Sequence, residues 1–269
     1  MSFRQPSKRS FAVAVGTATA VLVGVPAAAV VPGTAFVAPV PISLALLCGI
    51  AATVLALRVP SLPISLVRAR VHLGVLAVPL GVVVVAPFLF PALDLSGSPD
   101  DGLLLGLLAV FVASGALYVA TTNRYAVLLN AAHSPIAEWR ARPDARYSRR
   151  VRVASFVGGI AALALPLLVH LPGVRLLPGI GGVLIAQSIF YRRSRTYQLF
   201  DDGLLIRASG TVVYQFVPAG QLSSVKRGPD AISIRRSLPW PFPIRCAVDE
   251  LARPDELLST LRDAIERRP

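Results

Sequence analysis

The sequence predicts a bundle of about six transmembrane helices followed by a small α+β domain of antiparallel strands and one C-terminal helix. The 269-residue chain is 54% hydrophobic and only 15% charged, whereas soluble domains carry about 25% charged residues. Long apolar segments alternate with connections, several of them basic, up to residue 193. From residue 194 onward, short segments with alternating polar and apolar residues replace them, which favours strands.

The apolar segments are long enough to cross a hydrocarbon core of about 30 Å. Pro79 and Pro87 interrupt the third segment, but prolines are tolerated inside membrane bundles. The first segment could instead be a signal peptide. Its apolar run exceeds the roughly 7–15 residues of a signal core, so we expect a retained helix. The predicted spans are residues 11–31, 35–57, 71–90, 102–121, 151–171 and 174–191.

The basic residues of the connections predict the orientation. Lys and Arg concentrate at the N-terminus, in residues 58–70 and in residues 122–152, whereas residues 32–41 and 91–101 contain none. Cytoplasmic loops carry the excess of Lys and Arg. We therefore expect a cell-membrane protein with both termini in the cytoplasm, a multi-pass transmembrane domain over residues 1–193 and a cytoplasmic domain over residues 194–269.

The long connection between the fourth and fifth spans contains two local signals. Ser134-Pro135 predicts a helix start, with the hydroxyl as N-cap and proline in the first turn. Trp139 lies among Arg140, Arg142 and Arg146, which suggests a position among the lipid headgroups.

The cytoplasmic domain is predicted as a series of short strands. Asp201-Asp202-Gly203 and Ser209-Gly210 predict tight turns between them. A helix is expected from Pro254, with acidic residues in its first turn and a stripe of leucines. The predicted strands are Tyr197–Leu199, Leu204–Ala208, Thr211–Val217 with Val212, Tyr214 and Phe216 on one face, Gln221–Lys226, Ala231–Arg236 and Phe242–Cys246.

Five to seven short strands and a C-terminal helix follow the order of a pleckstrin-homology-like (PH-like) domain. Residues 197–207 and 216–225 resemble the opening hairpin and the next strand of bacterial PH-like domains in multi-pass membrane proteins. The resemblance covers residues 194–267 and implies an interaction or assembly module with a protein partner. Phosphoinositide-binding PH domains carry a basic cluster around the first hairpin. Here that hairpin contains only Arg207, so the resemblance does not imply lipid-phosphate recognition.

Arginines flank the last two predicted spans. They are candidates for contacts with anionic lipid headgroups, because basic residues near a membrane surface contribute about 1 kcal/mol each. The alternative is that they only fix the topology. The candidate residues are Arg192, Arg193 and Arg195 after the last span, and Arg149, Arg150 and Arg152 around the start of the fifth.

The sequence contains no convincing catalytic, cofactor or metal site. His72, His133 and His170 fall at separate places in the predicted topology, and a metal site needs three or four converging ligands. No Asp, Glu, Lys or Arg falls within the core of a predicted span, which argues against ion- or proton-coupled transport. The net charge of +13 is assigned to the membrane face and not to nucleic acid, since no recognition motif accompanies it.

These observations favour a non-enzymatic membrane protein that acts as a tethered interaction or assembly module through its PH-like domain. The alternative is a permease or channel for a small neutral solute, which would use the spans broken by proline. The lipid bilayer and a protein partner are the expected contacts, with no cofactor and no metal.

Overall fold

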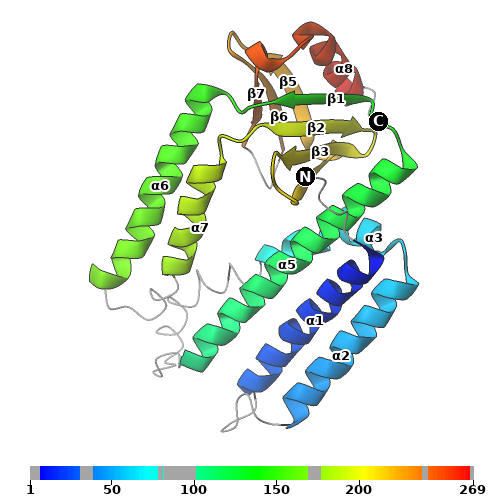
Figure 1. Cartoon of the computed structure of the whole chain (residues 1–269), viewed down its shortest axis with the longest axis vertical. Coiled ribbons are helices and arrows are strands. Elements are labelled where there is room, and N and C mark those ends of the chain that lie inside the picture. Colours follow the sequence, from blue (N-terminus) through cyan, green and yellow to red (C-terminus); the bar gives the residue numbers. More distant parts are fainter. Residues whose placement is uncertain are drawn as a thin grey trace. The chain divides into compact units, whose positions relative to one another are not determined.

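The computed structural model describes residues 7–30, 39–77, 81, 101–168, 177–237 and 242–266. The chain divides into two compact units (Figure 1). Residues 1–127 and 164–178 form the first, called here the helical unit. Residues 128–163 and 179–269 form the second, called here the β unit.

The helical unit is held together by close contacts between small residues. If Gly16 carried a Cβ atom, it would lie 2.7 Å from the carbonyl oxygen of Gly49. Small residues of this kind let membrane helices approach closely. Phe11 and Val15 of the first helix join a buried apolar cluster that includes Leu117. The elements are α1 (Lys8–Val30), α2 (Pro39–Arg58), α3 (Leu62–Arg68) and α5 (Asp101–Ala132), which continues into the β unit.

Within the described residues, four helices are long and apolar enough to cross a membrane. They correspond to the first, second, fourth and fifth predicted spans. Of the third span, only residues 71–77 and 81 are described, and these are helical. The sixth corresponds to α7 (Leu177–Phe190), an apolar helix of 14 residues. The four helices are Lys8–Ala28, Val40–Arg58, Gly106–Ala132 and Ala145–Leu168.

The β unit contains two antiparallel sheets and a C-terminal helix, α8 (Pro254–Glu266). α8 packs against β5 of the second sheet. The first sheet has the order β1 (Ala137–Ala141), β2 (Arg195–Phe200), β3 (Gly203–Ala208) and β4 (Tyr214–Pro218). The second has the order β5 (Leu222–Arg227), β6 (Ala231–Arg236) and β7 (Ile244–Ala247).

The two sheets share one apolar core and are joined beside β1. Pro143 forms an isolated antiparallel bridge with Cys246 of β7, and the backbone N–H of Ala247 donates to the carbonyl oxygen of Arg142 at 3.0 Å. The core buries residues from both sheets together with Leu258 and Leu261 of α8. Strand alternation explains this, because every second side chain of a strand points to the same face.

An apolar helical hairpin is inserted between the neighbouring strands β1 and β2 (Figure 1). Residues 142–144 alone lead from β1 into α6 (Ala145–Leu168), and residues 191–194 lead from α7 into β2. The two helices touch closely at Gly159, where an added Cβ would lie 2.9 Å from the carbonyl oxygen of Gly181. The hairpin is therefore attached to the sheet by two short links.

Strand β1 corrects two predictions. No helix starts at Ser134-Pro135, and the chain instead extends into β1, with the next helix beginning at Ala145. The side chain of Trp139 is not exposed to contact headgroups: it is 9% exposed and stacks on Tyr197 with ring centroids 5.3 Å apart. The domain predicted to begin at residue 194 does not include β1, although β1 is a strand of its first sheet. Ala137–Ala141 lacks β-branched residues, so only pairing with β2 makes it a strand.

Strand β4 begins later than predicted. It runs from Tyr214 to Pro218, and Val217 lies in the core at 1% exposed, whereas Val212, which precedes the strand, is 49% exposed. The N–H of Thr211 bonds to the carbonyl oxygen of Ala208, so Thr211 belongs to the turn after β3.

Candidate functional site

A basic pocket lies in the β unit, beside the attachment of the α6–α7 hairpin. Its volume is about 840 Å³, and five of its eleven lining residues are arginines. None of the lining residues is acidic. Three segments form it: the start of α6 with its preceding link, the link from α7 to β2, and the turn after β3. The lining residues are Arg142, Pro143, Ala145, Ser148, Arg149, Arg152, Arg192, Arg193, Ser194, Ser209 and Gly210.

The hairpin positions most of the arginines. Arg149 and Arg152 are three residues apart on α6, so they share one face of the helix. Nε of Arg152 donates to the carbonyl oxygen of Ser188 on α7 at 3.0 Å. The guanidinium of Arg193 lies 4.4 Å from the centre of the Phe190 ring. These contacts fix two of the guanidinium groups at the end of the hairpin.

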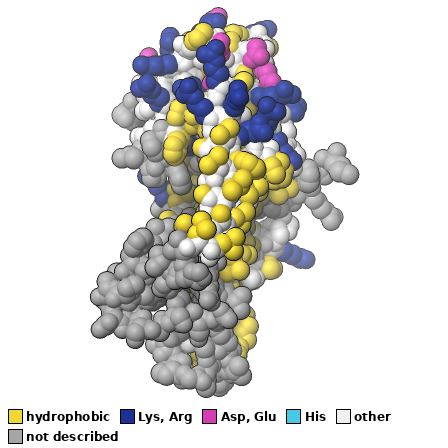
Figure 2. Space-filling model, turned by 90° about the vertical axis from the view of Figure 1, so that its left-hand side faces the viewer, with side chains coloured by type: hydrophobic (Ala, Val, Ile, Leu, Met, Phe, Trp, Pro, Cys, Tyr) yellow, Lys and Arg dark blue, Asp and Glu magenta, His cyan; other side chains and the backbone are white. Residues whose placement is uncertain are grey.

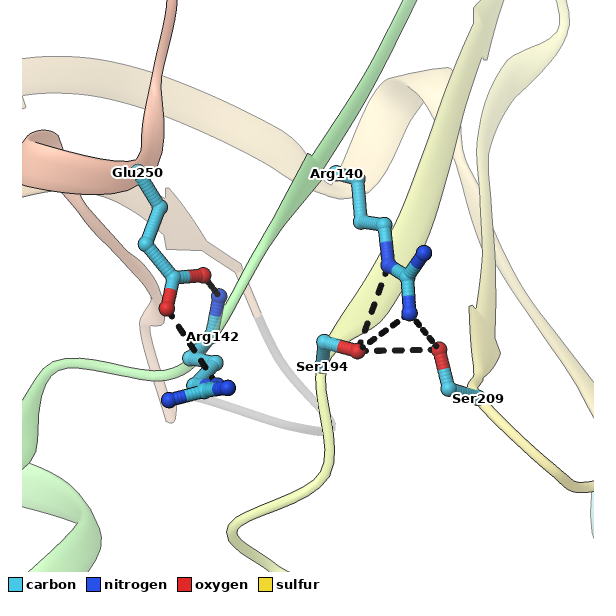
Figure 3. Close-up of polar contacts among 5 residues, drawn as sticks. All are labelled: Arg140, Arg142, Ser194, Ser209 and Glu250. Carbon is cyan, nitrogen blue, oxygen red and sulfur yellow. Dashed lines mark hydrogen bonds and ion pairs between the residues drawn. The ribbon is translucent and has the colours of Figure 1, made fainter.

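Two serine hydroxyls form the polar side of the pocket nearest the sheet (Figure 3). The Oγ atoms of Ser194 and Ser209 are 2.9 Å apart. Arg140 of β1 donates to both hydroxyls, from NH2 to Ser194 at 3.0 Å and to Ser209 at 3.1 Å. The backbone pairs the same residues, since the N–H of Ser209 donates to the carbonyl oxygen of Ser194 at 2.7 Å. Arg140 therefore holds the two hydroxyls together.

Arg142 is the one lining arginine, within the described part of the chain, that has an acidic partner (Figure 3). Its Nε lies 3.3 Å from Oε1 of Glu250. Its backbone N–H donates to Oε2 of the same carboxylate at 2.7 Å. The carboxylate thus offsets the charge of Arg142 and fixes the link between β1 and α6.

The pocket lies where the hairpin changes from charged to apolar. Figure 2 shows Lys and Arg side chains gathered at the upper end of a band of apolar side chains. Beyond Arg152, the apolar residues Val153, Phe156, Val157 and Ile160 of α6 are exposed. Large exposed apolar surfaces mark contacts with membrane or protein. A bilayer around this band would bring its headgroups to the level of the pocket.

Four of the six predicted headgroup residues meet in the pocket: Arg149, Arg152, Arg192 and Arg193. The other two lie outside its lining. Arg150 is exposed on α6, and the guanidinium of Arg195 lies 4.9 Å from the centre of the Tyr191 ring.

Sequence reasoning missed the remaining polar members of the pocket. The pairing of β2 with β3 brings Ser194 beside Ser209, and the pairing of β1 with β2 brings Arg142 and Ser148 to them. Their sequence neighbourhood carries no motif. One sequence signal for β1 does exist, because the buried residues Trp139 and Ala141 alternate with charged residues. In a strand of only five residues, this alternation is a weak indication.

Other reactive groups do not form a site among the described residues. No three His, Cys, Asp or Glu side chains within these residues are grouped as a metal site requires. Cys246 is buried in the core of the β unit, and this burial raises the pKa of its thiol. A raised pKa keeps the thiol protonated, and the protonated form is a poor nucleophile.

Comparison of the chain with family models, with curated protein sequences and with solved structures gives no match to any of them.

Proposed function

We propose that this chain is an integral membrane protein whose β unit is a PH-like interaction module, held at the cytoplasmic membrane surface to bind a protein partner. The observation that carries the proposal is the double attachment of the sheet to the apolar hairpin. Links of residues 142–144 and 191–194 leave the sheet little freedom to move away from the hairpin. A domain attached in this way acts at the membrane surface.

The strand order supports the PH-like part of the proposal. Antiparallel sheets of four and three strands precede a C-terminal helix that packs on the second sheet. This is the arrangement that the resemblance of residues 197–207 and 216–225 implies. Such a domain presents exposed strand edges and grooves, and peptides bind to both in many interaction modules.

Membrane placement is tested by reporter fusions to the full chain. A cytoplasm-active reporter fused after Pro269 should be active, because the basic connections place the C-terminus inside. The same reporter fused after Gly33, in a connection without basic residues, should be silent. The opposite pattern would reverse the orientation, and release of the protein by alkaline carbonate would contradict membrane integration.

Partner binding is tested at a second pocket of the β unit. This pocket has a volume of about 440 Å³ and is lined by β1, α8 and the segment before α8. A photo-crosslinking amino acid at Thr260, in its lining, should give one discrete protein adduct in cells. The control is the same amino acid at Asp201, in an exposed turn outside the pocket. Equal adducts at both positions, or none, would contradict a specific partner at this surface.

A permease remains the second candidate because of polar groups on α5. Ser114 and Thr121 are fully buried, and their hydroxyls have no hydrogen-bond partner among the described residues. Unpartnered polar groups are costly in an apolar environment, and they can serve a polar solute. Uptake of neutral solutes into proteoliposomes, abolished by Thr121→Val, would favour this candidate over the interaction module.

A further inference from the structure

We infer that the basic pocket binds a phosphate group, carried either by an anionic lipid headgroup or by a small soluble phosphate. The inference deepens the proposed function and rests on it only for the level of the pocket at the membrane surface. The charges and hydrogen-bond donors of the pocket are what favour phosphate itself.

The charge of the pocket is not balanced by the described residues around it. Glu250 offsets Arg142, which leaves four lining arginines without an acidic partner. Asp144, beside the pocket, is already engaged: it accepts from the backbone N–H of Arg146 at 3.0 Å and from NH1 of Arg245 at 3.4 Å. Like charges gathered in a concave site create a strong positive potential, which an anion relieves.

The arginines also have unused donors. The guanidinium groups of Arg149 and Arg192 form no hydrogen bond or ion pair with any described residue. Arg152 donates Nε to the backbone of α7, and Arg193 donates NH1 to the carbonyl oxygen of Ser209 at 3.4 Å. Each guanidinium has five N–H groups in a planar fork that matches the oxygens of phosphate. Two arginines are thus fixed in place and two more are free to close on the ligand.

The serine pair supplies a further hydrogen-bond donor. Two hydroxyls have two hydrogens, and the contact of 2.9 Å between Ser194 and Ser209 uses one of them. Arg140 only donates, so it occupies lone pairs on both oxygens and accepts neither hydrogen. One O–H group therefore stays available for a ligand oxygen. Four guanidinium groups and a hydroxyl exceed what the two oxygens of a carboxylate accept, and they suit the three or four oxygens of phosphate.

The experiment uses the purified full-length protein in a neutral detergent. Thermal unfolding is followed during titration with inorganic phosphate, and with acetate at matched ionic strength. A second arm titrates short-chain phosphatidic acid against short-chain phosphatidylcholine. The test variant is Arg149→Gln in the pocket. Its matched control is Arg150→Gln, which removes the same charge from the next residue of α6, outside the lining.

We expect phosphate to raise the unfolding midpoint of the wild type and of Arg150→Gln, and acetate to leave it unchanged. Arg149→Gln should weaken phosphate affinity about tenfold, because a charge-assisted hydrogen bond is lost. If Arg149→Gln also lowers the midpoint without ligand, Arg192→Gln replaces it as the test variant.

Stabilisation by phosphatidic acid alone would identify a lipid headgroup as the source, and stabilisation by inorganic phosphate would identify a soluble one. Equal weakening by Arg149→Gln and Arg150→Gln would overturn the inference, because it would indicate diffuse attraction to the surface. Absence of any shift with either phosphate would overturn it as well. These measurements need no partner and no bilayer, so they can fail while the reporter and crosslinking results stand.

Discussion

At the scale of single residues, Glu250 fixes the link between β1 and α6. It contacts the backbone and the side chain of Arg142. The Arg142 side chain is 67% exposed and that of Glu250 31% exposed, so the ion pair itself contributes little and the bond to the backbone N–H matters more. Glu250→Gln should lower the free energy of unfolding by about 1 kcal/mol.

The measurement is denaturant unfolding of the purified protein. The matched control is Glu256→Gln, because Glu256 pairs with Arg253 on the exposed surface of α8 at 3.2 Å. Exposed pairs of this kind contribute roughly 0.5 kcal/mol or less. A larger loss for Glu256→Gln than for Glu250→Gln would contradict the proposed role of Glu250.

Cys246 provides a second test at this scale. Burial raises the pKa of its thiol above the ordinary value of 9.0, so little thiolate forms near neutral pH. Iodoacetamide should label Cys246 slowly in the folded protein at about pH 7.5 and quickly in urea, as measured by peptide mass spectrometry. The stability gained by keeping this thiol neutral is complete below pH 9.0 and decreases as the pH rises through the raised pKa. Rapid labelling of the folded protein would contradict this burial.

At the scale of elements, the close contact of α6 with α7 depends on Gly159. A Cβ atom there would lie 2.7 Å from Cγ1 of Ile185 and 2.9 Å from the carbonyl oxygen of Gly181. Gly159→Ala should therefore lower the unfolding free energy by about 1–3 kcal/mol, as overpacking does. Gly158→Ala is the control, because its Cβ would meet only Cδ1 of Leu184 at 3.7 Å. Similar unfolding midpoints for the two variants would contradict this packing.

The sequence predicts most of the β unit because its signals are local. Alternation and turn residues predict β2, β3, β5, β6 and β7, and the leucine stripe with its acidic first turn predicts α8. Gly203 is an example: its φ is +152°, and an added Cβ would lie only 2.2 Å from the carbonyl oxygen of Val217, so the turn before β3 needs glycine. Such requirements are visible in the sequence.

β1 and the pocket depend on long-range pairing, which local signals do not carry. Ala137–Ala141 pairs with β2 although an entire helical hairpin separates the two strands. The arginines were recognised by their place beside apolar spans, and four of them do meet. Their convergence with Ser194 and Ser209 follows only when β1 and β2 are neighbours, since that pairing brings both links of the hairpin together.

At the scale of the whole molecule, the insertion of the hairpin makes the β unit discontinuous in sequence. A fragment of residues 194–269 lacks β1, so it would expose Tyr197 and one edge of β2. Unpaired strand edges with apolar neighbours aggregate readily. We expect this fragment to be insoluble or poorly folded, and the folded β unit to require the strand that precedes the hairpin.

A shortened chain tests this directly. β1 and β2 are antiparallel neighbours, with Ala141 opposite Arg195, so a tight turn can replace the α6–α7 hairpin. A chain in which an Asn-Gly turn joins residues 134–142 to residues 194–269 should be a soluble, folded monomer with a dispersed amide NMR spectrum. The control carries Trp139→Ala, which removes the ring stacked on Tyr197 and should lower the unfolding free energy by about 3–5 kcal/mol. A well-folded fragment of residues 194–269 would contradict the requirement for β1, because it would mean that the core closes without Trp139.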